Sequence, residues 1–158
     1  MAENRGKKFE AIIRDSFNAV PNTNVVRLHD QTNGFKGSTN PCDFIVYKYP
    51  YQYMIECKSV HGNTLPFSNI TDNQRRGMLE ASEVYGIVAG VICWWVDKDI
   101  TKFIPIQLIQ KMKDKGGKSI RYDILCSSGY STIEIPGRKK RVFFDYDMEK
   151  FFEAISSI

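Results

Sequence analysis

Apolar side chains recur at helical spacing near both ends of the chain. Phe9, Ile13 and Phe17 stand four residues apart, so we expect an amphipathic helix from about Gly6 to Asn18. Residues 147–158 carry a similar pattern and are expected to form a closing helix. The two ends of the chain are therefore predicted to be helical.

Between these helices, apolar residues gather in short stretches that are typical of strands. Strands are expected at 25–29, at 141–146, and at 43–47 and 53–60, which should pair antiparallel across a short turn. The continuous apolar run at 88–95 predicts a strand that is covered on both faces. Strands and helices in this order indicate an α/β fold with a central sheet flanked by helices.

Local capping signals predict two further helices and one loop. Thr71 and Asp72 can cap a helix that runs to about Tyr85, with Gly86 as its stop. Gln107–Lys113 should form a short helix. Residues 30–42 are rich in Gly, Asn and Pro and should form a loop.

Length and composition narrow the class of protein. A chain of 158 residues with 42% hydrophobic residues fits a single domain spanning 1–158. No apolar run approaches the ~20 residues of a membrane helix, and the polar start MAENRGKKFE is unlike a secretory signal. We therefore expect a cytoplasmic protein without membrane association. The four cysteines are scattered and lack the spacing of a zinc site.

The positive charge is divided among several clusters. The net charge is only +4, but separate groups of Lys and Arg suit a phosphate backbone. The alternative is a set of solvated surfaces. Basic groups stand near residues 5–8, 75–76, 111–121 and 138–141. The residues that we expect to contact DNA are Arg5, Lys7, Lys36, Ser38, Arg75, Arg76, Lys115 and Lys118.

The segment with the clearest chemistry lies in the two paired strands. Glu56 and Lys58 are two residues apart on a predicted strand, so they should share one face, and Asp43 opens the preceding strand. Carboxylate oxygens are the ligands that Mg²⁺ or Mn²⁺ prefers, and such an ion can activate water against a phosphodiester. The backbone carbonyl of Cys57 is a possible third ligand. The alternative is an exposed Glu/Lys pair on an edge strand.

The arrangement D43–x12–E56-C-K58 resembles the PD-(D/E)XK nuclease signature, and the wider pattern is similar to the RecU family of Holliday junction resolvases. The motifs that carry the wider resemblance are NRG at 4–6 before a helix bearing Glu10, GSTN at 37–40, LPFSNI at 65–70, DNQ at 72–74 and GKSIR at 117–121. The resemblance covers about residues 4–125.

This resemblance implies a restriction-endonuclease-like fold, with a central mixed β-sheet flanked by helices. It further implies that Asp43 and Glu56 bind Mg²⁺ or Mn²⁺ and that Lys58 is the catalytic lysine. Glu10 would approach the metal from the first helix, and Gln74 would contribute from the later one. Members of the family work as homodimers that cut opposing strands of a four-way junction, in Gram-positive bacteria and their phages.

The chain departs from the patterns that it resembles in two places. Pro41-Cys42, before Asp43, fits the general nuclease signature only with one residue inserted. Only residues 30–42 stand where RecU proteins carry a longer stalk, so any stalk is short here. The resemblance also suggests a branch-migration helicase as partner, and location in a bacterial cytoplasm, which is the host cell if a phage encodes the protein. Alternatives are a related nuclease acting on linear duplex, of the restriction or repair type, a non-catalytic DNA-binding module, and a protein-interaction domain.

Overall fold

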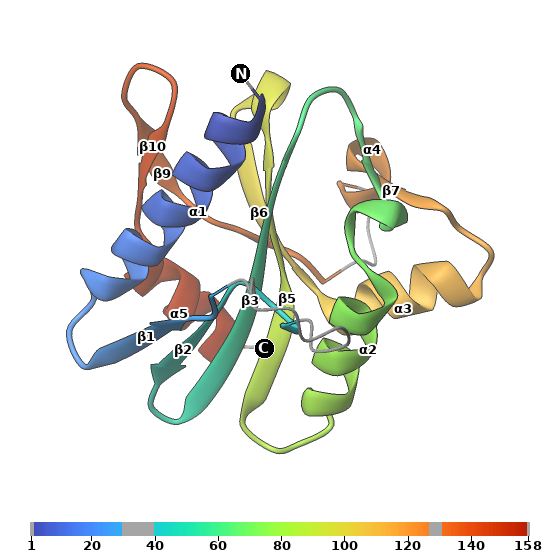
Figure 1. The fold of residues 1–158 in the computed structure, drawn as a ribbon. Coiled ribbons are helices and arrows are strands. Elements are labelled where there is room, and N and C mark those ends of the chain that lie inside the picture. Colours follow the sequence, from blue (N-terminus) through green and yellow to red (C-terminus); the bar gives the residue numbers. More distant parts are fainter. Residues whose placement is uncertain (1, 30–39, 127–130, 158) are drawn as a thin grey trace.

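The computed structural model describes residues 2–29, 40–126 and 131–157, with the side chains from residue 4 onward in the first range (Figure 1). Its main sheet has six strands in the order β1-β2-β3-β5-β6-β8. β3 and β5 are parallel, and every other neighbouring pair in this sheet is antiparallel. The expected central mixed sheet is therefore confirmed. The strands are β1 (Thr23–Arg27), β2 (Phe44–Lys48), β3 (Tyr51–Val60), β5 (Ile87–Trp95), β6 (Ile100–Pro105) and β8 (Ile133–Glu134).

Helices cover both faces of the sheet, which gives a three-layer arrangement. α1 (Ala2–Asn18) and α5 (Met148–Ser156) pack on one face, and α2 (Asp72–Ala81) and α3 (Ile106–Asp114) pack on the other (Figure 1). Both terminal helices were predicted, although α1 begins at Ala2 rather than Gly6. Its face toward the sheet carries Phe9, Ile13 and Phe17, all buried as the spacing indicated.

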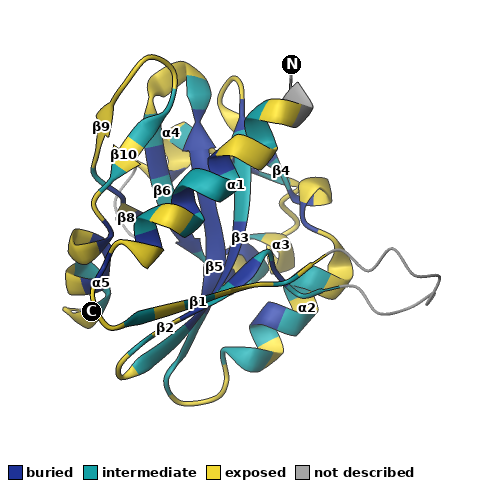
Figure 2. Cartoon of the chain, turned by 60° about the vertical axis from the view of Figure 1, so that its left-hand side comes forward, coloured by how far each residue is buried: buried dark blue, intermediate teal, exposed yellow. Residues whose placement is uncertain are grey.

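β5 shows why a continuous apolar run predicts a central strand. Val91, Cys93 and Trp95 face the α2–α3 layer, whereas Ile92 and Trp94 face the α1–α5 layer. Successive side chains on a strand point to opposite faces, so both faces of β5 need apolar residues. All five side chains are buried, as the dark strand in the middle of Figure 2 shows. The two adjacent tryptophans thus lie in separate layers of the core.

α2 begins where its capping residues predicted and ends early. The Thr71 hydroxyl accepts a hydrogen bond from the Gln74 backbone N–H, and the Gln74 side chain accepts one from the Thr71 N–H, which completes a capping box. The helix ends at Ala81 rather than Tyr85, and a turn leads to Gly86, whose φ of 87° suits glycine. No described helix is long and apolar enough to cross a membrane.

Several short elements were not predicted from the sequence. The segment 61–70 contains β4 (Thr64–Pro66) and the 3-10 turn η1 (Phe67–Asn69), and β4 pairs with β7 (Ser119–Arg121). The strand expected at 141–146 spans only 144–146, and it pairs antiparallel with the strand at 137–139 to form a hairpin. The other short elements are η2 (Val96–Lys98), α4 (Tyr122–Leu125), β9 (Gly137–Lys139) and β10 (Phe144–Tyr146).

Candidate active site

Asp43 lies at the point where the pairing between β2 and β3 ends. Its backbone N–H donates to the Ile55 carbonyl at 3.0 Å, and its Oδ2 accepts from the Cys57 N–H at 2.7 Å. The carboxylate therefore takes the place of a backbone acceptor at the strand edge. The preceding Pro41 has no N–H and cannot continue the ladder itself. This local geometry fixes the Asp43 carboxylate beside β3.

Glu56 and Lys58 share the face of β3 that looks toward α2 and α3, as their spacing predicted. The Lys58 Nζ lies 3.2 Å from Glu56 Oε2. The Glu56 side chain is only 3% exposed, whereas that of Lys58 is 26% exposed. Ile55 and Cys57 lie on the opposite face, in the α1–α5 layer. The alternative of an exposed Glu/Lys pair on an edge strand does not fit, because β3 is central and Glu56 is buried.

Gln74 links the start of α2 to Glu56. Its side-chain Nε2 donates to Glu56 Oε2 at 3.2 Å, while its Oε1 caps the helix at the Thr71 N–H. The capping box holds the first turn of α2, and the first turn holds the amide against the carboxylate. The structure thus brings Gln74 to the predicted site.

The two carboxyl groups stand in an environment that disfavours negative charge. Burial, followed by repulsion from Glu56, raises the pKa of Asp43 to about 8, although the Cys57 N–H acts to lower it. Burial also raises the pKa of Glu56, while Lys58 and Gln74 act in the opposite direction. Two adjoining carboxyl groups with raised pKa values are an arrangement that a bound cation would relieve.

The donor set at this site fits a hard divalent cation. Glu56 Oε1 is buried and has no hydrogen-bond partner among the described residues. A buried carboxylate oxygen without a partner is costly, so a ligand for it is expected. Across the same residues no group of three or more His, Cys, Asp and Glu side chains is gathered for a metal. Mg²⁺ is commonly held by one or two carboxylates, with water and substrate phosphate completing its shell.

Glu10 lies near this site but has other partners in the structure. Its Oε1 is 3.4 Å from Arg27 Nε and 3.9 Å from Arg14 Nη1. The negative charge of Glu10 repels the two carboxylates and so contributes to the raised pKa values of both Asp43 and Glu56. The side chain does not complete a three-carboxylate group with them, so its contact with a metal stays a prediction.

The residues predicted to contact DNA differ in exposure. Arg75 is directed into the contact between α2 and α3, where it meets Gln110, and its side chain is only 14% exposed. Arg76, one residue later, is exposed. Lys7 on α1, and Lys115 and Lys118 after α3, are also exposed. Lys36 and Ser38 lie outside the described residues, and Arg5 contacts the end of β3.

A polar network at the end of β3 was not predicted. The His61 Nδ1 is 2.9 Å from Asp97 Oδ1, its Nε2 contacts the Arg5 guanidinium, and the Gly62 N–H donates to Asp97 Oδ2 at 2.6 Å. The Gly62 N–H and His61 hold the pKa of Asp97 below its usual range. Asp97 follows β5, and only the parallel pairing of β3 with β5 brings it to His61. No local sequence signal points to that contact.

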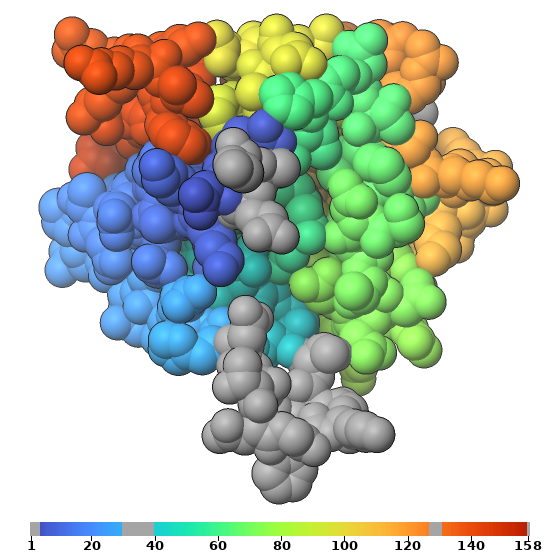
Figure 3. Space-filling view, turned by 45° about the horizontal axis from the view of Figure 1, so that its top comes forward, coloured from blue at the N-terminus to red at the C-terminus, as the bar shows by residue number. Residues whose placement is uncertain are grey.

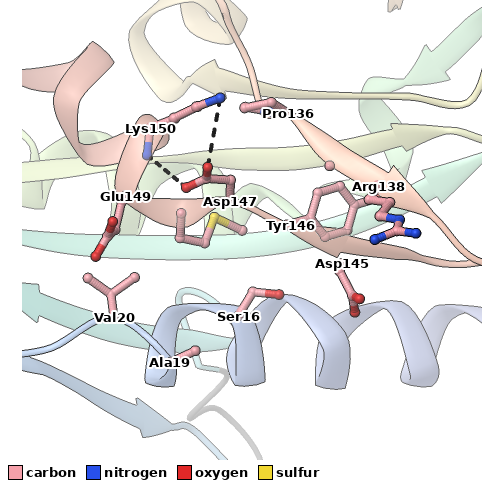
Figure 4. Close-up of a pocket in the computed structure, with 12 residues that line it drawn as sticks. Ser16, Ala19, Val20, Pro136, Arg138, Asp145, Tyr146, Asp147, Glu149 and Lys150 are labelled. Atoms are coloured by element: carbon pink, nitrogen blue, oxygen red, sulfur yellow. Dashed lines mark hydrogen bonds and ion pairs between the residues drawn. The ribbon is translucent and has the colours of Figure 1, made fainter.

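Two cavities lie away from the carboxylates. One, of about 460 Å³, is bordered by Ser16 of α1, by Val20 just after that helix, by Arg138 and Tyr146, and by the start of α5 (Figure 4). The other, of about 580 Å³, is bordered by α5 and by the turn that joins β2 to β3. Neither is lined by Asp43, Glu56 or Lys58. The candidate site is therefore identified by its polar contacts.

Comparison with known proteins gives likenesses in structure but no match in sequence. No protein-family model matches this chain, and no curated protein sequence matches it. Among the solved structures, Hjc from Archaeoglobus fulgidus, a Holliday junction resolvase from an archaeal hyperthermophile, is similar with a TM-score of 0.49 and 17% sequence identity. The alignment covers 65% of this chain and 78% of that chain. Function therefore has to be inferred from the residues of the site.

Proposed function

We propose that this chain is a metal-dependent, structure-selective DNA endonuclease that resolves Holliday junctions and other branched DNA by phosphodiester hydrolysis. The observation that carries the proposal is the buried Glu56 carboxylate, one oxygen of which lacks a partner among the described residues. Asp43, Lys58 and Gln74 are arranged around or beside it. The order of motifs along the chain is similar to that of the RecU family, and this similarity supports branched DNA as the substrate.

Each side chain of the site has a distinct task in this proposal. Asp43 and Glu56 would hold Mg²⁺ or Mn²⁺, with the Cys57 carbonyl as a third protein ligand and Glu10 approaching from α1. The cation would supply positive charge that polarises the scissile phosphate, and it would lower the pKa of the attacking water. Lys58 is partly exposed and would turn from Glu56 toward the phosphate, where its ammonium stabilises developing negative charge. Gln74 orients the Glu56 carboxylate.

Recognition of the substrate would depend on phosphate contacts rather than on base sequence. Lys7, Arg76, Lys115 and Lys118 are exposed and offer such contacts. A homodimer with two sites would cut opposing strands symmetrically. The RecU resemblance supports four further parts of the proposal. They are the homodimer, a branch-migration helicase as partner, location in the bacterial cytoplasm and a phage origin.

The decisive experiment is cleavage of a labelled synthetic four-way junction in Mg²⁺ or Mn²⁺. The wild type is compared with Asp43→Asn and Lys58→Ala, and a linear duplex of the same sequence serves as the control substrate. We expect paired symmetric nicks in the junction, made by the wild type alone, while both variants still bind it.

The other outcomes identify the competing functions. Equal cleavage of the linear duplex would keep the chemistry and reject selectivity for branched DNA, as in a restriction or repair nuclease. Tight binding with no cleavage in any divalent cation would indicate a non-catalytic DNA-binding module. Cleavage by Asp43→Asn at the wild-type rate would show that the active site lies elsewhere.

A further inference from the structure

The hairpin formed by β9 and β10 is fixed to the core by aromatic side chains on one face. The ring centroids of Phe143 and Phe144 lie 5.4 and 6.5 Å from that of Trp94, and the Tyr146 ring lies 6.2 Å from Phe9. The Tyr146 hydroxyl also forms a 2.7 Å hydrogen bond with Thr101 Oγ1. These contacts hold the hairpin in place and leave its remaining side chains free to point outward.

Most of the outward side chains of this hairpin are basic. Four consecutive exposed residues, 138–141, are Arg or Lys. Two of them are neutralised locally, because Lys139 pairs with Asp99 and Lys140 lies 3.1 Å from Asp145. Arg138 and Arg141 make no ion pair with any other described residue. The tip therefore carries positive charge that the folded chain does not compensate.

The tip of the hairpin and the start of α1 form a groove between them. A hollow of about 310 Å³ is lined by Asn4, Arg5 and Lys8 on the helix and by Val142 and Phe143 on the hairpin. Figure 3 shows the orange-red hairpin lying beside the dark-blue start of α1. Arg5 and Lys8 line the helical side, and Arg141 adjoins Val142 on the other. Both sides of the groove thus offer cations.

Arg5 connects this groove to the strand that carries the candidate active site. Its Nε donates to Ser59 Oγ at 3.4 Å, and its guanidinium contacts His61. Ser59 comes directly after Lys58 on β3. Three residues of an extended strand span about 10 Å, close to three 3.4 Å steps of duplex DNA. A backbone held at Glu56 would reach the groove within a few nucleotides.

We propose that the β9–β10 hairpin and the first turns of α1 form a clamp for the sugar–phosphate backbone of the DNA arm that leaves the active site. The clamp rests on the proposed nuclease function and extends it to a surface of stated residues. Uncompensated cations on two sides suit an evenly spaced row of phosphates, and each neutralised phosphate releases counterions. The Arg5 contacts set the orientation of the groove relative to β3.

The test compares two double variants that each remove two positive charges. Lys8→Gln/Arg141→Gln removes exposed cations from the two sides of the groove. Lys48→Gln/Lys150→Gln, on the far end of β2 and on α5, is the matched control. Affinity for a labelled four-way junction is measured by fluorescence anisotropy in EDTA, at several salt concentrations between about 50 and 200 mM.

We expect the groove variant to bind about tenfold more weakly than the control and to have a shallower salt dependence. The slope of log K against log salt should fall by about 0.9 for each phosphate that the protein no longer neutralises, or about 2 in total. Equal affinity and equal slope in the two double variants would overturn the clamp. If the two double variants bound equally well but the wild type still cut junctions, the clamp would be rejected and the nuclease function would stand. A wild type that neither binds nor cuts DNA would reject both proposals.

Discussion

At the scale of single residues, the site depends on one amide that has two partners. Gln74 accepts from the Thr71 N–H through Oε1 and donates to Glu56 through Nε2. A Glu at this position would serve equally well in a capping box, but it would bring a third negative charge to the site. The neutral amide therefore suits a helix start that adjoins buried carboxylates.

Replacing Gln74 should separate catalysis from stability when Thr71 serves as the control. Thr71→Ala removes the hydroxyl cap and should cost about 1 kcal/mol of unfolding free energy, with kcat/KM for junction cleavage within about twofold of the wild type. Gln74→Ala should cost a similar stability and reduce kcat/KM about tenfold or more, because a hydrogen bond to a charged group is worth about 1.5–3 kcal/mol. Equal reductions of kcat/KM in the two variants would show that Gln74 acts only as a cap.

The raised pKa of Asp43 predicts how stability changes with pH in EDTA. A carboxyl whose pKa is raised by folding favours the folded state while it is protonated, and this contribution is lost between the unfolded pKa, about 4, and the folded value of about 8. Asp43→Asn should therefore lose less stability than the wild type from pH 4 to pH 8. At pH 8 it should be the more stable by at least about 1 kcal/mol.

Urea denaturation at several pH values measures this difference. Asp15→Asn, which changes an exposed carboxylate on α1 with no ion pair to another described residue, is the matched control and should follow the wild-type curve. Parallel curves for Asp43→Asn and the wild type would mean that Asp43 is not buried beside a second negative charge. Added Mg²⁺ should raise the stability of the wild type at pH 8 and have little effect on Asp43→Asn.

At the scale of elements, the sequence predicted those whose pattern is long enough to be unambiguous. The helical spacing in α1 and the apolar run of β5 each reflect packing against a whole layer. β4, β7 and β9 have three residues each and exist because a distant partner pairs with them. Their sequences carry no period, so only the assembled fold could reveal them.

The candidate site follows the same division. Glu56 and Lys58 were placed on one face because a strand has a period of two. The contacts of Arg75 with α3, and of Asp97 with His61, join segments that are far apart in the chain. Nothing near either residue in the sequence indicates such a partner, so the basic character of Arg75 alone suggested DNA contact.

Adjacent arginines on α2 should therefore respond differently to replacement. Arg75→Ala removes a largely buried side chain between two helices and should destabilise the fold by about 1–3 kcal/mol. Arg76→Ala changes an exposed side chain and should alter stability by less than about 0.5 kcal/mol, while it lowers the salt slope of DNA binding by about 1. Chemical denaturation and anisotropy titrations measure the two effects, and a reversal of the pattern would contradict this placement.

At the scale of the whole molecule, the mixed sheet separates two hydrophobic layers, and the candidate site belongs to one of them. Glu56 and Lys58 face the α2–α3 layer, while Cys57 faces α1 and α5. The groove beside the hairpin lies against α1, so the chemistry and the proposed clamp stand on different layers. β3 is the element common to both, because Arg5 reaches it at Ser59.

The two buried tryptophans give each half of the core its own fluorescent reporter. Trp94→Phe leaves emission from Trp95, among side chains of the α2–α3 layer, and Trp95→Phe leaves emission from Trp94, beside Phe9 and Phe143. Because one sheet joins the layers, both signals should change at the same urea concentration, together with the far-UV circular dichroism of each variant. An earlier transition for Trp95 alone would reveal a protein in which the layer that carries the candidate site loosens while the other layer stays folded.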